Sequence, residues 1–555
     1  MNNEWKSPRW GAALIVLLTV VVYIPALRAG FVFDDTTLIT DNRLVSAGDG
    51  LYRFWLTRQA PDYYPLTWSL WWLEWRLWGD NPLGYHVVNV LLHALNAILA
   101  WTILQRLKVP GAWLAGVVFA LHPVNTATVA WISEQKNTLS MLFYAMAILL
   151  YLKYDEEGQP QWYRFSVGAF LLALLSKTVV VMLPVVVLGC LWWRHGRLRR
   201  KDVLDSLPFF VLSLVLGILT VWFQHHRALA GHMAPPPGFF SRLAVAGCVP
   251  WFYLYKALLP FHLTVVYAKW PVDASRWIGY APGIILIGCL GLFWWARKTW
   301  GRPLFFGLGY FVVMLFPVLG FFYQGFNRFS WVADHWQYHA IIGAIALVVA
   351  AVEWIGRRVG GRARHWEVGI GMTVVLALGV ATWTRAGVYA NDETLWRDNV
   401  AKNPSAWPYN LLGCALQQSG KFAEAIGQFE EALRVDPDYA EAHGNWGNTL
   451  LQAGKLEEAM EQWEQAVRLQ PNYPQAHYNL GLGLARQGKV QEAMKHWEDA
   501  LRIKPDYAEA HYNLGIALEQ AGRTREAIQH YEQALTFRPD YALAKTRLVQ
   551  LRVVP

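Results

Sequence analysis

The chain has 555 residues, of which 55% are hydrophobic and only 16% charged, a balance typical of membrane proteins and not of soluble enzymes. Residues 406–541 hold 12 Lys/Arg and 19 Asp/Glu, a net charge of −7, whereas the whole chain carries +9, so the remainder carries +16. Because the basic charge lies in the apolar part, it indicates membrane orientation and argues against binding to nucleic acid.

An apolar segment follows Lys6 and Arg9 at the N-terminus. It begins like a secretory signal peptide, but no Ala-x-Ala cleavage site follows, so we expect a retained first span. Further apolar stretches of roughly spanning length predict about 11 crossings within a membrane domain of residues 1–390. The predicted spans are residues 10–27, 83–106, 111–124, 137–153, 163–176, 179–194, 207–224, 277–296, 304–322, 338–356 and 367–385.

Short basic connections between these spans set the predicted orientation. With about 11 crossings they all lie on the side of Lys6 and Arg9, which we expect to be cytoplasmic, and the C-terminal region lies on the opposite side. The stretch 241–260 is apolar enough to span, but another crossing would move the later arginines outside, so we expect it to be re-entrant or interfacial. The basic residues are Arg106, Lys108, Arg194, Arg197, Arg199, Arg200, Lys201, Arg297, Lys298, Arg302, Arg357, Arg358, Arg362 and Arg364.

The first outer loop, residues 28–82, opens with the adjacent carboxylates Asp34 and Asp35. Carboxylates beside a bilayer are costly unless they are exposed or functional. From the residues alone, this pair could supply a general base, hold a metal or cap a helix. Later in the loop, tryptophans at helical spacing predict a helix lying in the membrane interface, either as an anchor or in contact with a lipid substrate. These are Trp68, Trp71, Trp72, Trp75 and Trp78.

The C-terminal region repeats itself every 34 residues, the period of tetratricopeptide (TPR) repeats. Glycine, alanine and proline recur at fixed positions in four units, residues 406–439, 440–473, 474–507 and 508–541. A capping helix is expected within residues 542–555, and residues 391–405 read as a half-repeat that links the array to the last span. The recurring residues include Gly413, Gly447, Gly481, Gly515, Ala425, Ala459, Ala493, Ala527, Pro437, Pro471, Pro505 and Pro539.

The first helix of each unit is expected to line the concave face of the solenoid. Asparagine and tyrosine recur there at neighbouring positions, namely Asn445, Asn479, Asn513, Tyr478 and Tyr512. Such a ladder predicts an acceptor-binding face for an extended peptide, or asparagines that only satisfy polar groups between helices. The sequence leaves these two interpretations equal.

Several segments carry a family resemblance: FVFDDTTLITDN, YYPLTWSLWW, GYHVVNVLLHALNAIL, HPVNTATVAWISEQKNTLS, LSKTVVVMLP, YLYKALLPFHLTVVY and ADHWQYHAIIG. Together they resemble the transmembrane-and-TPR (TMTC) protein O-mannosyltransferases and their bacterial relatives, over essentially the whole chain. That family is similar to the GT-C glycosyltransferases. The resemblance therefore implies an all-α fold, a polytopic transmembrane GT-C-like helical domain followed by a TPR α-solenoid.

The resemblance also implies an activity. GT-C enzymes take a sugar, here a mannose-like hexose, from a polyprenyl-phosphate carrier on the outer face of the membrane, and the acceptor implied is a protein hydroxyl. An aspartate at the start of the first outer loop is the expected catalytic base, which points to Asp34 or Asp35, with Asp35 slightly favoured. In inverting transfer the base deprotonates the acceptor hydroxyl as the phosphate departs. The departing phosphate needs cationic or N–H partners, for which the candidates are Lys177, Arg328, Lys136 and His335.

The sequence departs from the family pattern in two places. Ala127 stands where the family often has a glutamate, so Glu134 is the remaining second carboxylate, or else a cap for the following helix. His335 stands where an arginine is common, and Lys177 could merely extend to the membrane boundary. No metal site is predicted for His335 and His339 or for His225, His226 and His232, which lack a zinc signature, and a divalent cation is left open. The cysteines Cys190, Cys248, Cys289 and Cys414 suggest neither disulfides nor zinc.

Two other functions compete with this interpretation. An O-antigen-ligase-like transferase would need a long late outer loop, whereas the one here, about residues 323–337, is short. A non-catalytic TPR scaffold would have no use for an outer acidic pair. Few cysteines and a short TPR array favour a bacterial inner-membrane protein with its repeats in the periplasm, the eukaryotic equivalent being the ER membrane with luminal repeats.

Overall fold

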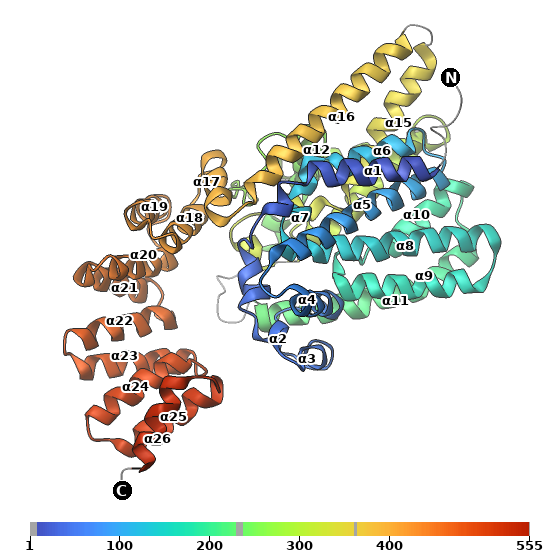
Figure 1. Cartoon of the computed structure of the whole chain (residues 1–555). Coiled ribbons are helices and arrows are strands. Elements are labelled where there is room, and N and C mark those ends of the chain that lie inside the picture. Colours follow the sequence, from blue (N-terminus) through green and yellow to red (C-terminus); the bar gives the residue numbers. More distant parts are fainter. Residues whose placement is uncertain (1–7, 229–236, 323, 360–362, 554–555) are drawn as a thin grey trace. The chain divides into compact units, whose positions relative to one another are not determined.

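The computed structural model describes residues 8–228, 237–322, 324–359 and 363–553, which form helices and no strand (Figure 1). The predicted all-α fold is confirmed. The chain divides into two compact units, Met1–Asp398 and Asn399–Pro555, and the division falls within α17 (Asp392–Lys402). Lys6, His232 and Arg362, which entered the sequence analysis, lie outside the described residues.

The first unit is built from apolar helices joined by short turns and by several longer segments, such as the one between Leu258 and Trp277. Its N-terminal half contains α1 (Pro8–Val22), α2 (Arg43–Ser46), α3 (Gly50–Leu56), α4 (Pro65–Trp78), α5 (Pro82–Arg106), α6 (Ala112–Leu121), α7 (Thr126–Val129), α8 (Gln135–Glu157) and α9 (Pro160–Ser176). Its C-terminal half contains α10 (Leu183–His195), α11 (Arg200–Phe223), α12 (Phe239–Leu258), α13 (Ala281–Trp295), α14 (Gly301–Leu315), α15 (Ile341–Val359) and α16 (Ala363–Val388).

Helices occupy every range that was predicted to span. Within the described residues, 6 helices are long and apolar enough to cross a membrane, or 7 if the bent pair Ala112–Leu121 and Pro123–Val129 is one span. The helices at the other predicted positions are shorter or less apolar, and so is α12, which covers the stretch expected to be re-entrant. The chain is thus a multi-span membrane protein by composition and length, while the number of crossings stays a prediction.

α8 connects two chemically different ends of the first unit. It packs against α5 and α9, and its 23 residues at about 1.5 Å per residue are about as long as a bilayer's apolar core is thick (Figure 1). Glu134 directly precedes its first turn, whereas Asp155 and Glu156 lie in its last turn. A group at one end of α8 therefore lies about one membrane thickness from a group at the other end.

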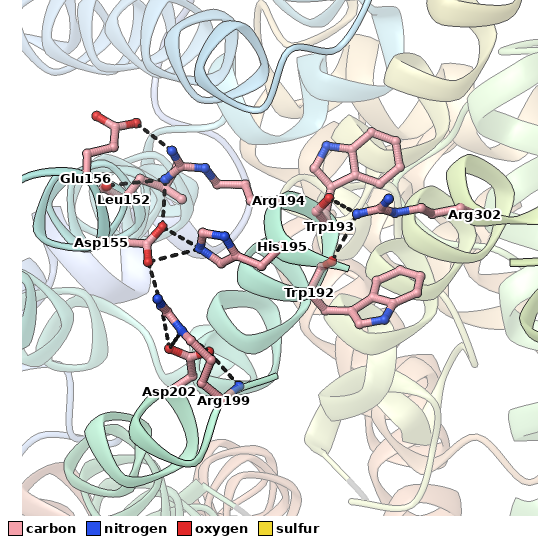
Figure 2. Close-up of polar contacts among 10 residues, drawn as sticks. All are labelled: Leu152, Asp155, Glu156, Trp192, Trp193, Arg194, His195, Arg199, Asp202 and Arg302. Atoms are coloured by element: carbon pink, nitrogen blue, oxygen red, sulfur yellow. Dashed lines mark hydrogen bonds and ion pairs between the residues drawn. The ribbon is translucent and has the colours of Figure 1, made fainter. Parts of the chain in front are cut away.

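The basic clusters meet at the C-terminal end of α8 (Figure 2). The carboxylate of Asp155, only 3% exposed, accepts from Arg194 at 2.9 Å and from Arg199 at 2.8 Å, and Glu156 pairs with Arg106 at 2.9 Å. Arg302 donates to the carbonyl oxygens of Trp192 and Trp193 and so caps the C-terminal end of α10, where the helix dipole favours a cation. Basic residues from three separate connections therefore gather at one end of the unit.

The tryptophan face of α4 packs into the protein. α4 starts with Pro65 at its first position and ends at Gly79, whose φ of 57° suits a residue without a side chain. Trp68 and Trp71 are each 2% exposed and pack with Phe54, Tyr85 and Ile132. The tryptophan face therefore packs against protein and not against lipid, because the first outer loop folds around a small core, and the location of α4 in the membrane interface stays a prediction. The residues that α4 exposes are Leu73, Arg76 and Leu77.

The second unit is a stack of helical hairpins. The pairs are α18 (Ala406–Gln418) with α19 (Phe422–Val435), α20 (Ala440–Gln452) with α21 (Leu456–Leu469), α22 (Pro474–Arg486) with α23 (Val490–Ile503), and α24 (Ala508–Gln520) with α25 (Thr524–Phe537), followed by α26 (Ala542–Val553). Glycines in the left-handed conformation, Gly420, Gly454, Gly488 and Gly522, end the first helix of each pair. The predicted TPR architecture is confirmed.

The asparagine ladder forms hydrogen bonds between neighbouring repeats. The Nδ2 groups of Asn445, Asn479 and Asn513 donate to Asn410 Oδ1, Asn448 Oδ1 and Tyr478 Oη at 3.0, 2.7 and 2.9 Å. Tyr478 and Tyr512 pack against the core of the stack. The ladder therefore has a structural role, and its role in acceptor binding stays a prediction.

In each hairpin a glycine of the first helix packs against an aromatic ring of the second helix. A Cβ atom added at Gly481 would lie 2.5 Å from Nε1 of Trp497. We expect Gly481→Ala to destabilise this repeat by about 1–3 kcal/mol through overpacking. Hydrogen exchange of the α22 and α23 amides measures the effect. The matched control is Gly427→Ala in α19, where a Cβ atom meets nothing within 4 Å and should stabilise by up to ~1 kcal/mol; equal protection in both variants would contradict the prediction.

Candidate functional site

The two aspartates of the first outer loop have different surroundings. Asp35 is fully buried, and its carboxylate accepts from the backbone N–H of Val32 at 3.0 Å and of Ser133 at 2.6 Å. Asp34 is partly exposed and lies within electrostatic reach of Lys136 and Glu134. Asp35 therefore ties the first outer loop to the segment before α8, while Asp34 is influenced electrostatically by charged side chains at the start of α8.

The backbone just before Asp34 is strained. Phe33 has φ of 52°, a left-handed conformation that is unusual for a bulky residue and costs about 1–3 kcal/mol. Its N–H donates to Asp392 Oδ1 at 2.7 Å, and its ring packs against those of Trp131 and Trp396 at centroid distances of 5.4 and 5.0 Å. Residues at the start of α17 thus hold the segment that presents Asp34.

Glu134 is the centre of a buried charge cluster. Its Oε1 lies 2.9 Å from Lys136 Nζ and 3.9 Å from His335 Nε2, and its Oε2 lies 3.3 Å from Lys177 Nζ. The Glu134 side chain is 2% exposed, and no side-chain hydrogen bond from it caps the first turn of α8. Glu134 thus occupies the N-cap position of α8, but its carboxylate pairs with the cluster and does not cap the helix. The Lys177 ammonium, on a side chain only 13% exposed, pairs with the buried Glu134 carboxylate.

The protonation states in this cluster follow from burial and neighbouring charge. Burial alone would raise the pKa of Glu134, but the adjacent cations outweigh it and lower the pKa to about 2, so Glu134 is an anion. Burial lowers the pKa of Lys177 to about 8 and that of His335 to about 3, so near pH 7 the lysine is mostly charged and the imidazole is neutral. Burial raises the pKa of Asp34 to about 6, which makes it a stronger base than an exposed aspartate.

Sequence reasoning named most of this cluster but not all of it. Asp62 was missed: Lys136 and Lys177 act on its charge, burial raises the pKa of its carboxyl group, and it accepts a hydrogen bond from Gln224. Asp392 was also missed, because no local signal links it to Phe33, 359 positions earlier. For Arg328, the structure shows the guanidinium 5.3 Å from the centroid of the Phe329 ring, and its role in phosphate binding stays a prediction.

Comparison with known proteins agrees with these features. The profile described as dolichyl-phosphate-mannose-protein mannosyltransferase matches residues 62–223, which include Asp62, Glu134 and both lysines. TPR profiles match residues 413–452, 447–488 and 472–540. The resemblance to the TMTC family is confirmed. Asp34 and Asp35 precede the matched mannosyltransferase segment, so their role rests on the geometry of the site.

The TMTC relatives are similar to this chain over most of its length. Protein O-mannosyl-transferase F38B6.6 of Caenorhabditis elegans is 24% identical over 77% of this chain and 63% of its own length. Human protein O-mannosyl-transferase TMTC3 is 23% identical over 79% of this chain and 52% of its own, and Drosophila melanogaster Tmtc3 is 25% identical over 79% and 56%. The chain thus spans between about half and two thirds of the length of these relatives.

Solved structures match the C-terminal repeats. One of them is MamA, 24% identical, which covers 27% of this chain and 88% of that protein with a TM-score of 0.25. Another is YrrB, described as a TPR protein with an unusual peptide-binding site, 24% identical over 31% of this chain and 86% of that protein, also with a TM-score of 0.25.

Proposed function

We propose that this protein is an inverting GT-C-type glycosyltransferase that moves a mannose-like hexose from a polyprenyl-phosphate carrier to hydroxyl groups of acceptor proteins. The observation that carries the proposal is the electrostatic influence of Lys136 and Glu134 on Asp34, since these two residues and Lys177 form one cluster in the segment similar to mannosyltransferases. The names of the TMTC relatives, protein O-mannosyl-transferases, support both the sugar and the class of acceptor.

In this proposal Asp34 is the general base. Its carboxylate takes the proton of an acceptor hydroxyl, whose oxygen attacks the anomeric carbon while the bond from that carbon to the phosphate oxygen breaks. The electron pair of the broken bond goes to the phosphate. Attack from the face opposite the phosphate inverts the anomeric centre. Asp35 supports the base by fixing the backbone next to it, since both of its carboxylate oxygens accept backbone N–H groups.

In this proposal Lys136 and Lys177 stabilise the negative charge that develops on the phosphate. The donor is a phosphodiester with one negative charge, and the departing lipid monophosphate carries a second charge as the bond breaks. Lys136 and Lys177 both pair with the carboxylate of Glu134, and the remaining N–H groups of the two ammonium ions can donate to the phosphate oxygens as this charge develops. Neutral His335 lies beside them and can donate one hydrogen bond.

The proposed site lies on the non-cytoplasmic side of the membrane. The basic residues around Asp155 at one end of α8 favour a cytoplasmic location for that end, by the excess of Lys and Arg in cytoplasmic loops. Glu134, at the other end of α8, is then at the outer face. In a bacterium this places the reaction in the periplasm, with the TPR repeats on the same side to bind acceptor proteins.

A transfer assay with the full-length protein in nanodiscs tests the proposal. The probe is radiolabelled mannosyl polyprenyl phosphate, and the acceptors are peptides that carry glycans in the parent strain and lose them in a strain without the protein. We expect label in the peptides with the wild-type protein. Donors carrying glucose or galactose identify the sugar. If the parent strain and the strain without the protein carried the same glycopeptides, the proposal would be overturned.

The hydrogen bond from the Phe33 N–H to Asp392 leads to a further prediction. Asp392→Ala removes the acceptor of the Phe33 N–H bond and should lower kcat about tenfold with little change in donor KM, because a misplaced base costs rate and not binding. The control is Glu393→Ala in the same turn of α17, where the partly exposed side chain pairs with Arg397 at 3.0 Å. Equal kcat values in the two variants would show that Asp392 does not position the base.

A further inference from the structure

Two histidines from facing helices meet inside the third TPR repeat. Nδ1 of His477, on α22, lies 3.1 Å from Nδ1 of His496, on α23, and Asp499 lies one turn further along α23. One ligand atom from each of these residues lies within 4.8 Å of the other two. Sequence analysis predicted no metal site, and it missed this group because the two histidines lie 19 positions apart without a zinc signature.

A backbone carbonyl fixes the tautomer of the first histidine. Nε2 of His477 lies 3.0 Å from the oxygen of Pro471, which can only accept a hydrogen bond, so Nε2 carries the hydrogen. In the neutral ring, Nδ1 of His477 then presents a lone pair to His496. A backbone carbonyl that orients the outer nitrogen is the usual support for a metal-binding histidine.

The spacing of the ligand atoms suits a small divalent ion. Zinc–nitrogen bonds of about 2.0–2.1 Å at tetrahedral angles place two nitrogens about 3.3 Å apart, close to the 3.1 Å between His477 and His496. Oδ1 of Asp499 accepts from Arg502 at 2.6 Å, and a carboxylate has a second oxygen to offer. We propose that His477, His496 and Asp499 bind a divalent transition-metal ion, with Zn²⁺ as the expected ion.

The neighbouring repeats contain incomplete versions of the same arrangement. In the fourth repeat His511 and His530 meet at 2.9 Å with Pro505 in the place of Pro471, but Gln533 stands at the position of Asp499. In the second repeat His443 meets Gln462 at 2.8 Å. The chain therefore contains natural replacements for two of the three ligands, His496 and Asp499.

Two chemical consequences follow from binding. Without the metal, the hydrogen between the two Nδ1 atoms must belong to His496, so metal binding at Nδ1 requires the neutral His496 ring to carry its hydrogen on Nε2 instead. Three protein ligands leave a fourth tetrahedral position for water or for a carboxylate or imidazole of a bound protein. The ion would thereby join α22 to α23 and add a ligand-exchange position to the repeat array, which is independent of the proposed transferase activity.

Metal titration of the full-length protein tests the site. Protein purified without a histidine tag and freed of metal is titrated with Zn²⁺ by calorimetry, and Co²⁺ reports coordination geometry through its visible spectrum. His496→Gln recreates the His–Gln pair of the second repeat, and Asp499→Gln recreates the glutamine of the fourth, so both variants copy arrangements that already fold in this chain. We expect each to weaken binding at least tenfold, with loss of the tetrahedral Co²⁺ spectrum.

A gain of binding gives the opposite test. Gln533→Asp completes the fourth repeat and should raise the number of ions bound from one to two per chain. His530→Gln should leave the single ion of the wild-type chain in place. Binding by the wild type that is no tighter than binding by the His496→Gln/Asp499→Gln double variant would overturn the proposal, as would equal losses in His496→Gln and His530→Gln.

Discussion

Asparagine in place of Asp34 should lower the rate of sugar transfer at least a hundredfold while membrane insertion and Tm stay unchanged. General base catalysis contributes about 10²–10⁴-fold, and the partly exposed Asp34 carboxylate is the base in the proposed mechanism. An amide of the same shape keeps the packing but cannot take the proton. Initial rates with labelled donor and acceptor peptide measure the effect, and thermal unfolding in detergent checks the fold.

The pH dependence of the wild type gives an independent reading of the same residue. Burial raises the pKa of Asp34 to about 6, and the base must be ionised to act. We therefore expect kcat/KM to be high at pH 7 and to fall as pH decreases through about 6. A rate that is flat from pH 7 to about pH 5 would contradict the assignment of Asp34 as the base.

Asp35→Asn separates the two aspartates. The buried Asp35 carboxylate accepts two backbone N–H groups, and an asparagine can accept only one of them with its oxygen. The variant should therefore lose about 1–3 kcal/mol of stability, with a reduced rate that follows the loss of folded protein. If Asp35→Asn lost all transfer activity at unchanged Tm while Asp34→Asn stayed active, Asp35 would be the base and Asp34 would not.

Glutamine in place of Glu134 should destabilise the first unit by about 3–5 kcal/mol. Breaking a buried ion pair leaves an uncompensated charge, and here Lys136 and Lys177 would both lose the anion they share. The low pKa of Glu134, about 2, gives the sign of the pH effect: its contribution to stability is present at neutral pH and is lost as pH falls from the ordinary glutamate range toward 2. Thermal unfolding of both proteins across pH measures this.

A second substitution checks the physical reason. If the cost arises from unpaired lysines, Glu134→Gln/Lys177→Met should recover part of the lost stability, because the double variant removes one of the stranded charges. Transfer should stay impaired, since Lys177 is a proposed phosphate partner. A double variant whose loss equals the sum of the two single losses would show that Glu134 and Lys177 do not interact.

Local patterns in the sequence predicted the parts of this molecule that depend on periodicity. Apolar stretches located the helices of the first unit, and the 34-residue period located the hairpins of the second, because both signals repeat along a contiguous segment. The direction of the tryptophan face of α4 could not be predicted in this way. An apolar face indicates burial in something apolar, and a bilayer and a protein core give the same pattern.

The candidate site could likewise be predicted from the sequence only in part. Glu134, Lys136 and Lys177 were each named for a separate reason, but their contacts depend on how α8 and α9 pack, which no spacing along the chain records. Asp34 and Asp35 were both candidates for the base in the sequence, with Asp35 slightly favoured. Only the positions of the Val32 and Ser133 N–H groups distinguish them, and those positions are set by the fold.

The left-handed backbone at Phe33 bears on where the protein can be cut or recombined. The residues that hold it, Asp392 and Trp396, come after the last long apolar helix, α16, and a boundary drawn at residue 390 would discard them. A truncated enzyme without the repeats should therefore retain α17, and a chimera that exchanges the repeats should join beyond Lys402. The first outer loop should likewise not be grafted alone onto another protein. Without Asp392 and Trp396, the turn that carries Asp34 would lose the contacts that hold Phe33.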